Sequence, residues 1–303
     1  MSKQEISTYF QQLQDEICLG LEALDGKSYF KQDLWKHAKG GGGRTRIIQN
    51  GNIFEKGGVN FSAVSGRLAE PMWKALHLTD SEEFFATGVS IVLHPESPLL
   101  PIMHMNVRYF EMANGQFWFG GGIDLTPHYV NEEDAHFFHT HLKNTCDKHH
   151  ETYYPEFKKW ADNYFFIPHR NETRGIGGIF FDRLSETDTH TKAERFAFVK
   201  SVGESFVDIY TYFVEKYAQK NYTEEQKTWQ LVRRGRYVEF NLVYDRGTKF
   251  GLQTNGRIES ILMSLPPHAN WEYCFDAKEN SEEAKTLTLL KKGIAWAEKC
   301  SVV

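Results

Sequence analysis

Two Asn-Gly dipeptides, each set between runs of β-forming residues, constrain the fold of this chain more than any other feature. An Asn-Gly pair favours the tight reversal of a β-hairpin, because both residues tolerate a positive φ angle. Asn114-Gly115 separates residues 105–112 from 116–119, and Asn50-Gly51 separates residues 44–49 from 52–54. Because the two arms of a hairpin are antiparallel, these turns predict an antiparallel sheet.

Segments with helical spacing flank the predicted strands. A capping box formed by Ser2 and Glu5 begins the first helix, which the pattern ends at Asp25-Gly26. Apolar residues then recur at helical spacing in three further segments, one that opens at Asn131 and two that span residues 192–217 and 282–299.

Residues 236–244 alternate between polar and apolar side chains, which predicts another strand. It follows a second capping box, formed by Thr223 and Gln226. Strands that cluster apart from helices indicate the α+β class rather than alternating βαβ units. A length of 303 residues allows one large core, so we expect a single domain over residues 1–303.

Charge and cysteine content exclude several classes of protein. The chain has 35 basic and 40 acidic residues, and a net charge of −5 does not favour nucleic acid or anionic membrane as a partner. No run approaches the roughly 20 apolar residues of a transmembrane helix, and the first residues lack the features of a secretory or organelle-targeting leader. The four cysteines are scattered, which argues against zinc, iron–sulfur or disulfide frameworks. We therefore expect a cytoplasmic protein.

The run that follows Pro101 places three polar side chains on one face of a strand. Side chains alternate along a strand, so His104, Asn106 and Arg108 point the same way at intervals of about 7 Å. Arginine binds carboxylates with a planar fork of donors, and histidine titrates near neutral pH. This face is a candidate site for proton transfer beside a bound carboxylate, or else a polar surface without function.

Asp124 follows a run of three glycines, which often marks a bulge or the close approach of a ligand. A two-residue hairpin register pairs Asp124 with Met105 and so places this carboxylate on the face opposite Arg108. A bulge in the glycine run would reverse that placement. The other interpretation of Asp124 is a side chain that caps the turn before Thr126-Pro127.

The predicted strand at 236–244 continues to Asp245 and lies among several arginines. A buried carboxylate here needs a cationic partner, and structural ion pairs or a ligand with several carboxylates would both account for the arginines. These are Arg233, Arg234, Arg236, Arg246 and Arg257.

Histidines are numerous, at 13, but they form no compact metal-binding motif. A metal site could still be assembled from separate segments, for example around His94, His104 and His169, or from His136 and His139, which lie three residues apart on a predicted helix. Nor do the glycine-rich stretches match a dinucleotide-binding turn, so the sequence indicates no organic cofactor.

Eight segments, taken in order, resemble the aerobic coproporphyrinogen III oxidase family, and the resemblance extends from the first helix to residue 273. They are residues 40–46 (GGGGRTR), 58–62 (GVNFS), 90–95 (SIVLHP), 104–108 (HMNVR), 119–127 (FGGGIDLTP), 169–172 (HRNE), 174–182 (RGIGGIFFD) and 234–247 (RGRYVEFNLVYDRG). The resemblance implies a flat antiparallel sheet with helices on both faces and a homodimer.

The resemblance also implies roles for individual residues. His104 corresponds to a proton donor, and Asp124 and Asp245 correspond to aspartates that face the pyrrole nitrogens of the substrate. Substrate contacts fall on Ser90, Asn106, Val107, Arg108, Asn255, Gly256 and Arg257. The family pattern before this last arginine is often Gly-Gly, so Asn255 departs from it. Four histidines correspond to a set sometimes assigned to a divalent metal: His94, His104, His139 and His169.

The implied substrate is a reduced tetrapyrrole with four propionates, and dioxygen is the implied co-substrate. In the hypothesis that follows, Asp245 or Asp124 takes a pyrrole proton and the electron-rich ring reacts directly with dioxygen, without an organic cofactor. Two alternatives are a histidine-metal oxygenase and a tetrapyrrole carrier without catalytic activity.

Overall fold

An antiparallel sheet of seven strands forms the centre of the computed structural model, which describes residues 1–37, 40–68, 73, 83–253 and 256–298. The strand order is β1-β2-β3-β4-β5-β6-β9, and each neighbouring pair is antiparallel. The strands are β1 Lys31–Lys36, β2 Gly41–Gln49, β3 Phe54–Arg67, β4 Glu83–Pro95, β5 Ile102–Met112, β6 Phe117–Thr126 and β9 Gly177–Leu184. A separate short pair consists of β7 Phe166–Ile167 and β8 Glu172–Thr173.

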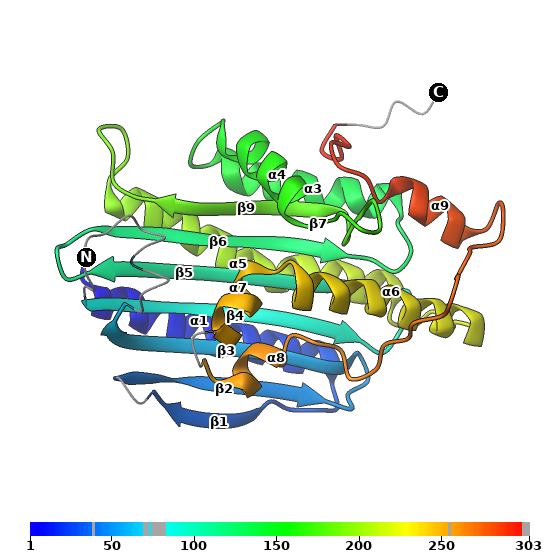
Figure 1. Ribbon diagram of the computed structural model, residues 1–303, viewed down its shortest axis with the longest axis horizontal. Coiled ribbons are helices and arrows are strands. Elements are labelled where there is room, and N and C mark those ends of the chain that lie inside the picture. The colour runs from blue at the N-terminus through cyan, green and yellow to red at the C-terminus, as the bar shows by residue number, and fades with distance from the viewer. Residues whose placement is uncertain (38–39, 69–72, 74–82, 254–255, 299–303) are drawn as a thin grey trace.

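Helices cover both faces of this sheet (Figure 1). They are α1 Lys3–Asp25, α3 Glu132–Asp147, α4 Tyr153–Tyr164, α5 Lys192–Tyr217, α6 Glu224–Val243, α7 Arg246–Gln253, α8 Ile258–Leu262 and α9 Glu282–Leu289. Helices α1 and α5 lie behind the sheet in Figure 1, whereas α6, α7 and α8 lie in front of it. The α+β class, the antiparallel sheet and its coverage on both faces are thus confirmed.

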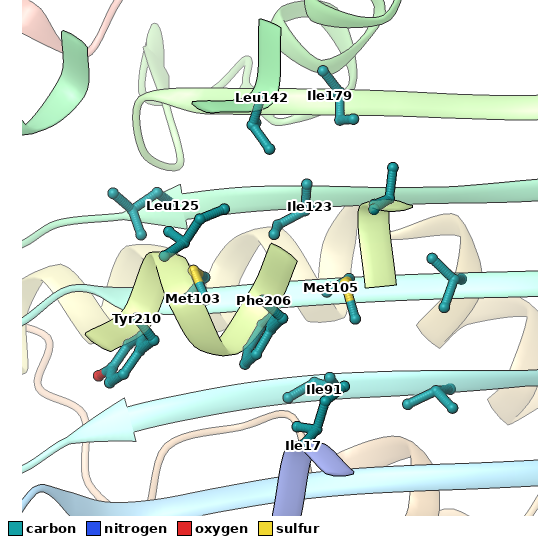
Figure 2. Close-up of a cluster of buried hydrophobic side chains, with 14 of the residues drawn as sticks. Ile17, Ile91, Met103, Met105, Ile123, Leu125, Leu142, Ile179, Phe206 and Tyr210 are labelled. Atoms are coloured by element: carbon teal, nitrogen blue, oxygen red, sulfur yellow. The ribbon is translucent and has the colours of Figure 1, made fainter. Parts of the chain in front are cut away.

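The main hydrophobic core lies between the sheet and the α1/α5 layer. Figure 2 shows Ile17 of α1 and Phe206 of α5 beside Ile91, Met103 and Met105 of the central strands. All five side chains are buried, and together with the aromatic residues of α5 they pack the two helices closely against the strands. The odd-numbered residues of β5 are committed to this core, so its even-numbered residues face α6 to α8.

The hairpin between β5 and β6 has a loop of three residues rather than two. The Met112 N–H donates to Gln116 O at 2.8 Å, and Gly115 adopts φ +87°. A left-handed glycine at this place shifts the register by one residue, as in hairpins with a G1 bulge. Asp124 therefore pairs with His104 and not with Met105. The predicted register was wrong, because the extra residue lies in the turn.

Replacing Gly115 with alanine should destabilise this hairpin by about 1–3 kcal/mol, because an L side chain is strained at positive φ. A Cβ at this position would meet nothing within 4 Å, so the effect should come from the backbone alone. Urea unfolding of Gly115→Ala measures it, with Ala113→Gly as a control in the same loop. Stability equal to that of the parent protein would show that the loop does not need a left-handed residue.

The predicted strand at 236–244 is wrong, because these residues form the second half of helix α6. The capping box at Thr223 and Gln226 is present, and the helix that it begins continues for 20 residues. β-Branched and aromatic residues near its end produced the misleading alternation, whereas burial follows helical spacing through Arg233, Tyr237 and Phe240. Tertiary contacts with the sheet outweigh the local β propensity.

The last helix is shorter than the sequence predicted. It was expected over 282–299, but α9 ends at Leu289. Leu290 leaves the helical region at ψ 62°, and Gly293 adopts φ +83°, which continues the chain as a turn. The other predicted helices are confirmed, including the capping box at Ser2 and the N-cap at Asn131.

Candidate active site on the polar face of the sheet

His104, Asn106 and Arg108 share the face of β5 that lies toward α6–α8, as predicted. We call this surface the polar face. Ser90 of β4 pairs directly with Asn106 and therefore lies on it too. Val107 does not, because its side chain is fully buried in the core on the other side of the sheet. A substrate contact at Val107, which the resemblance implies, would therefore have to be made by its backbone.

Asp124 lies directly beside His104 on the polar face. His104 Nδ1 is 2.7 Å from Asp124 Oδ1, and Arg174 donates to Asp124 Oδ2 at 2.6 Å. Burial alone would raise the pKa of Asp124, but the Arg174 guanidinium and the bond from His104 outweigh it and leave that pKa lowered. An ionised carboxylate only accepts hydrogen bonds, so Nδ1 carries the proton and Nε2 is left to act on a ligand.

Aromatic rings and an amide hold the Arg174 guanidinium in place beside Asp124. Its guanidinium lies between the rings of Phe165, Tyr237 and Phe240, at 4.5–4.7 Å from their centroids. It also donates to Asn241 Oδ1 at 2.7 Å. Both oxygens of Asp124 are therefore committed, and its side chain is only 2% exposed. Asp124 is suited to orient His104 and poorly placed to take a proton from a ligand.

Arg108 reaches across the glycine run of β6 to Asp182 of β9. Its guanidinium donates to Asp182 Oδ1 at 3.0 Å and to Asn106 Oδ1 at 2.8 Å. A Cβ on Gly120 would lie 2.5 Å from that Asp182 oxygen and 2.8 Å from Arg108. The glycine is required because the arginine lies flat on the backbone of β6.

Arg257 lies at the other end of the polar face. Its guanidinium donates to Ser260 Oγ at 2.9 Å and pairs with Asp33 of β1. Ser260 Oγ is 3.1 Å from Thr45 Oγ1, and Thr45 begins a row of paired residues that crosses the sheet through Asn106 to Gly122. The members of this row are Thr45, Asn60, Ser90, Asn106 and Gly122.

The glycine-rich contact predicted before Arg257 is only partly described. The Gly256 N–H donates to Gly251 O at 2.8 Å, which ties it to the end of α7. Asn255 lies outside the described residues.

Asp245 caps the start of α7, on the same side of the sheet. Its Oδ2 accepts the Thr248 N–H at 2.6 Å, and its Oδ1 accepts the Tyr164 hydroxyl at 2.8 Å. Tyr164 stacks on Phe180 with the ring centroids 4.2 Å apart, and Phe180 pairs with Gly122 of β6. Burial would lower the pKa of Arg174, but the charge of Asp124 and the weaker effect of Asp245 contribute to leaving that pKa raised. Asp245 therefore belongs to the same surface as His104 and Asp124.

The four histidines predicted as metal ligands are not brought together. His94 donates from Nε2 to Ser264 O at 2.8 Å, and His139 bonds the Ile176 carbonyl on the α3 side of the sheet at 2.9 Å. His169 bonds Tyr244 and Glu239, while His104 bonds Asp124. Within the part of the chain that the structure describes, no three His, Cys, Asp or Glu side chains form a group that could hold a metal ion. The residues present therefore do not fit a four-histidine site.

Several residues of the site were not predicted as such. Arg174, Asp182 and Tyr164 each bond a predicted site residue, and Asn241 bonds Arg174. Arg174 and Asp182 both lie within the segment at 174–182 that carries the family resemblance. A buried carboxylate such as Asp124 requires a cationic partner, and a search for that partner could have pointed to Arg174.

A second charged cluster, around Glu239 on α6, gives a pH prediction. Burial raises the pKa of Glu239, but bonds from Arg170 and His169 outweigh it and lower that pKa to about 2. A depressed folded pKa stabilises the protein above the unfolded value of roughly 4.3, and this contribution is lost as the pH falls toward 2. Glu239→Gln should thus be less stable than the parent at pH 7, with the difference shrinking between pH 4 and 2. Urea midpoints across this range measure it, and a difference independent of pH would contradict it.

A cavity of about 360 Å³ lies elsewhere, between the N-terminal end of α3 and α9. Its charged lining residues are Glu132, Glu133, Asp134, Glu282 and Lys285. Four carboxylates against one ammonium group disfavour an anionic ligand there. The described helices also include none that is long and apolar enough to cross a membrane.

Comparisons with known proteins agree with the resemblance in the sequence. A family model described as coproporphyrinogen III oxidase matches residues 5–296. The chain is 50% identical over 307 residues to the mitochondrial oxygen-dependent coproporphyrinogen-III oxidase of Rattus norvegicus, a match that covers 97% of this chain and 69% of the rat protein. It is 50% identical to the Drosophila melanogaster oxygen-dependent enzyme, over 94% of this chain and 76% of that protein. It is 48% identical to the chloroplastic coproporphyrinogen-III oxidase 1 of Arabidopsis thaliana, over 92% and 75% of the two chains.

Proposed function

The chain belongs to the coproporphyrinogen III oxidase family, and from that premise we propose that its reaction takes place on the polar face of the sheet. The reaction is the oxygen-dependent decarboxylation of two propionates of coproporphyrinogen III to vinyl groups, which gives protoporphyrinogen IX for haem synthesis. The observation that carries the assignment of the site is that His104, Asp124 and Asp245 share one face with two arginines. Those arginines, Arg108 and Arg257, are separated by the width of several strands.

The two arginines give this surface the right charge and dimension for a macrocycle with four carboxylates. Neighbouring strands lie about 4.8 Å apart, so the row from Thr45 on β2 to Asn106 on β5 spans roughly 14 Å. A guanidinium near each end can hold a propionate through two parallel hydrogen bonds. Ser90 and Asn106, between them, offer polar atoms to the ring system.

Two groups on this face can move protons. Asp124 orients His104, whose Nε2 can give a proton to the ligand when the imidazole ring is cationic. Asp245 is the base in this proposal, because it is partly exposed and accepts only neutral donors. Asp124 is too tightly paired with Arg174 for that role.

Removal of a pyrrole proton by Asp245 would raise the electron density of the ring that reacts with dioxygen. Each propionate then loses one proton and two electrons, and its carboxyl carbon leaves as carbon dioxide. Dioxygen takes up the two electrons with two protons and leaves as hydrogen peroxide, so one propionate, one dioxygen and one proton give one vinyl group, one carbon dioxide and one peroxide. The contribution of the protein is to hold the carboxylates, orient the ring and exchange protons at His104 and Asp245. No step is assigned to a metal or to an organic cofactor.

An assay in air and under nitrogen tests this function against its alternatives. Purified protein should convert coproporphyrinogen III to protoporphyrinogen IX in air, release two carbon dioxide molecules per substrate, and stop under nitrogen. A tetrapyrrole carrier would bind the substrate in both atmospheres without converting it. Activity that is lost on stringent chelation and restored by one metal ion per chain would favour the histidine-metal oxygenase instead.

Three further predictions belong with this proposal. We expect the chain to form one domain, to assemble as a homodimer and to act in the cytoplasm. The mitochondrial and chloroplastic names of the relatives belong to those proteins. Light scattering and cell fractionation test the last two expectations directly.

A further inference from the structure

Each of the two arginines assigned to the propionates faces an aspartate of the protein. Arg108 pairs with Asp182 at 3.0 Å, and Arg257 pairs with Asp33. The two aspartates come from β9 and β1, the outermost strands at opposite edges of the sheet. The same arrangement is therefore built twice, from segments far apart in the sequence.

These two pairs differ from the ion pair that holds Asp124. The Arg108 and Asp182 side chains are 38% and 31% exposed, and those of Arg257 and Asp33 are 27% and 55% exposed. Arg174 and Asp124 are almost completely buried. Exposed ion pairs contribute little to stability, whereas opening a buried pair leaves an uncompensated charge. Only the two exposed pairs can be opened at low cost.

The backbone around both pairs leaves room for flat side chains on the polar face. Gly120 lies under Arg108 and Asp182, where any Cβ would collide with both. At the other pair, the ring of Trp35 covers Gly43 and lies 6.0 Å from the Arg257 guanidinium. Trp35 donates to Thr45 Oγ1, the atom that Arg257 also approaches. Both guanidinium groups are thus fixed by neutral contacts, while their charge is balanced by an exchangeable carboxylate.

We infer that Asp182 and Asp33 are exchange partners, which neutralise Arg108 and Arg257 until a propionate takes their place. The inference rests on the proposed function, because it takes the ligand to be a tetracarboxylate that reaches both arginines. The reaction turns a propionate into an uncharged vinyl group, so an arginine that held it loses its counter-charge. The resident aspartate restores that charge balance when carbon dioxide has left.

This role makes an unusual prediction about substrate affinity. If each aspartate competes with a propionate, its removal tightens binding. Asp182→Asn and Asp33→Asn should each lower the Kd of coproporphyrinogen III by about two- to fivefold, the range expected for one exposed ion pair. Calorimetry under nitrogen measures Kd without turnover, because the reaction requires dioxygen.

Asp15→Asn is the matched control. Asp15 is also partly exposed and pairs with Arg44 and Arg46, but it belongs to α1 on the opposite side of the sheet. The Kd of coproporphyrinogen III for the Asp15→Asn variant should equal that for the parent protein. Thermal melting should show all three variants folded, since each replaces an exposed carboxylate by an amide of the same size.

The outcomes separate this inference from the proposed function. Unchanged or weaker substrate binding by an aspartate variant overturns the exchange role of that aspartate. Weaker binding would mean that the aspartate holds its arginine in place for the substrate. The proposed site still stands in that case if Arg108→Ala and Arg257→Ala both weaken binding. If neither arginine variant weakens binding, the substrate does not bind on the polar face at all.

Discussion

Asp245→Asn should lower kcat by about 10²- to 10⁴-fold, the range typical of a lost general base, while the Kd for substrate measured under nitrogen changes little. Asparagine keeps an oxygen that can accept the Thr248 N–H, and it is a good N-cap, so the start of α7 should persist. It cannot accept a proton from a pyrrole. The loss should therefore fall on the chemical step and not on binding.

Single-turnover mixing of the anaerobic complex with oxygenated buffer measures this step directly. Asp147→Asn serves as the control, because this aspartate pairs with Lys143 on the surface of α3 and should leave kcat unchanged. If Asp245→Asn turns over at the parent rate, Asp245 is not the base. If it loses affinity and rate in equal measure, the residue instead holds the substrate.

Removal of Arg174 is expected to have the largest effect on stability. Arg174→Met should lower the free energy of unfolding by about 3–5 kcal/mol at pH 7, because it leaves the buried Asp124 charge without its cation. Methionine fills part of the space between Phe165 and Tyr237, which keeps the cavity small. His104 alone then has to balance the carboxylate.

The pH dependence of this effect has a definite sign. In the parent protein the lowered pKa of Asp124 stabilises the fold at neutral pH, and that contribution fades as the pH falls through the folded pKa. Without Arg174, burial raises the pKa of Asp124, and the stability cost disappears once the group is protonated. The difference between parent and Arg174→Met should thus shrink in acid.

Chemical unfolding at pH 7 and pH 4 measures both values. Arg174→Met combined with Asp124→Asn is the informative control, since it removes the buried charge and should recover part of the lost stability. Equal stability of Arg174→Met and the parent at pH 7 would mean that Arg174 does not neutralise Asp124.

The sequence predicted the architecture because its local signals agree with its tertiary contacts. The two predicted hairpins, the capping boxes and the stripe of buried residues in α1 all occur, although the first reversal lies at Asn52-Ile53, directly after Asn50-Gly51. The shared face of His104, Asn106 and Arg108 followed from strand alternation alone. The same alternation places the Val107 side chain in the core.

Two features could not be derived from local patterns. The register of Asp124 depends on whether the turn at Gly115 contains two or three residues. This difference of one residue decides which face of the sheet each side chain of β6 occupies. The second half of α6 contains β-prone residues, and only its contacts with the sheet decide that it is helical. Asp245 was nevertheless assigned to the site, because the resemblance did not depend on its secondary structure.

The partners of the site residues were the hardest to predict. Arg174 and Asp182 are 50 and 74 residues from Asp124 and Arg108, the residues that they bond. Such pairs form only when β9 joins the sheet beside β6. Sequence spacing carries no information about them.

A crystal structure of the substrate complex, prepared without oxygen, would show where the macrocycle binds. The predicted result is a macrocycle on the polar face, with carboxylates within hydrogen-bonding distance of Arg108 and Arg257 and a pyrrole nitrogen beside Asp245. A macrocycle bound anywhere else, for example in the acidic cavity beside α3 and α9, would show that the polar face is not the active site.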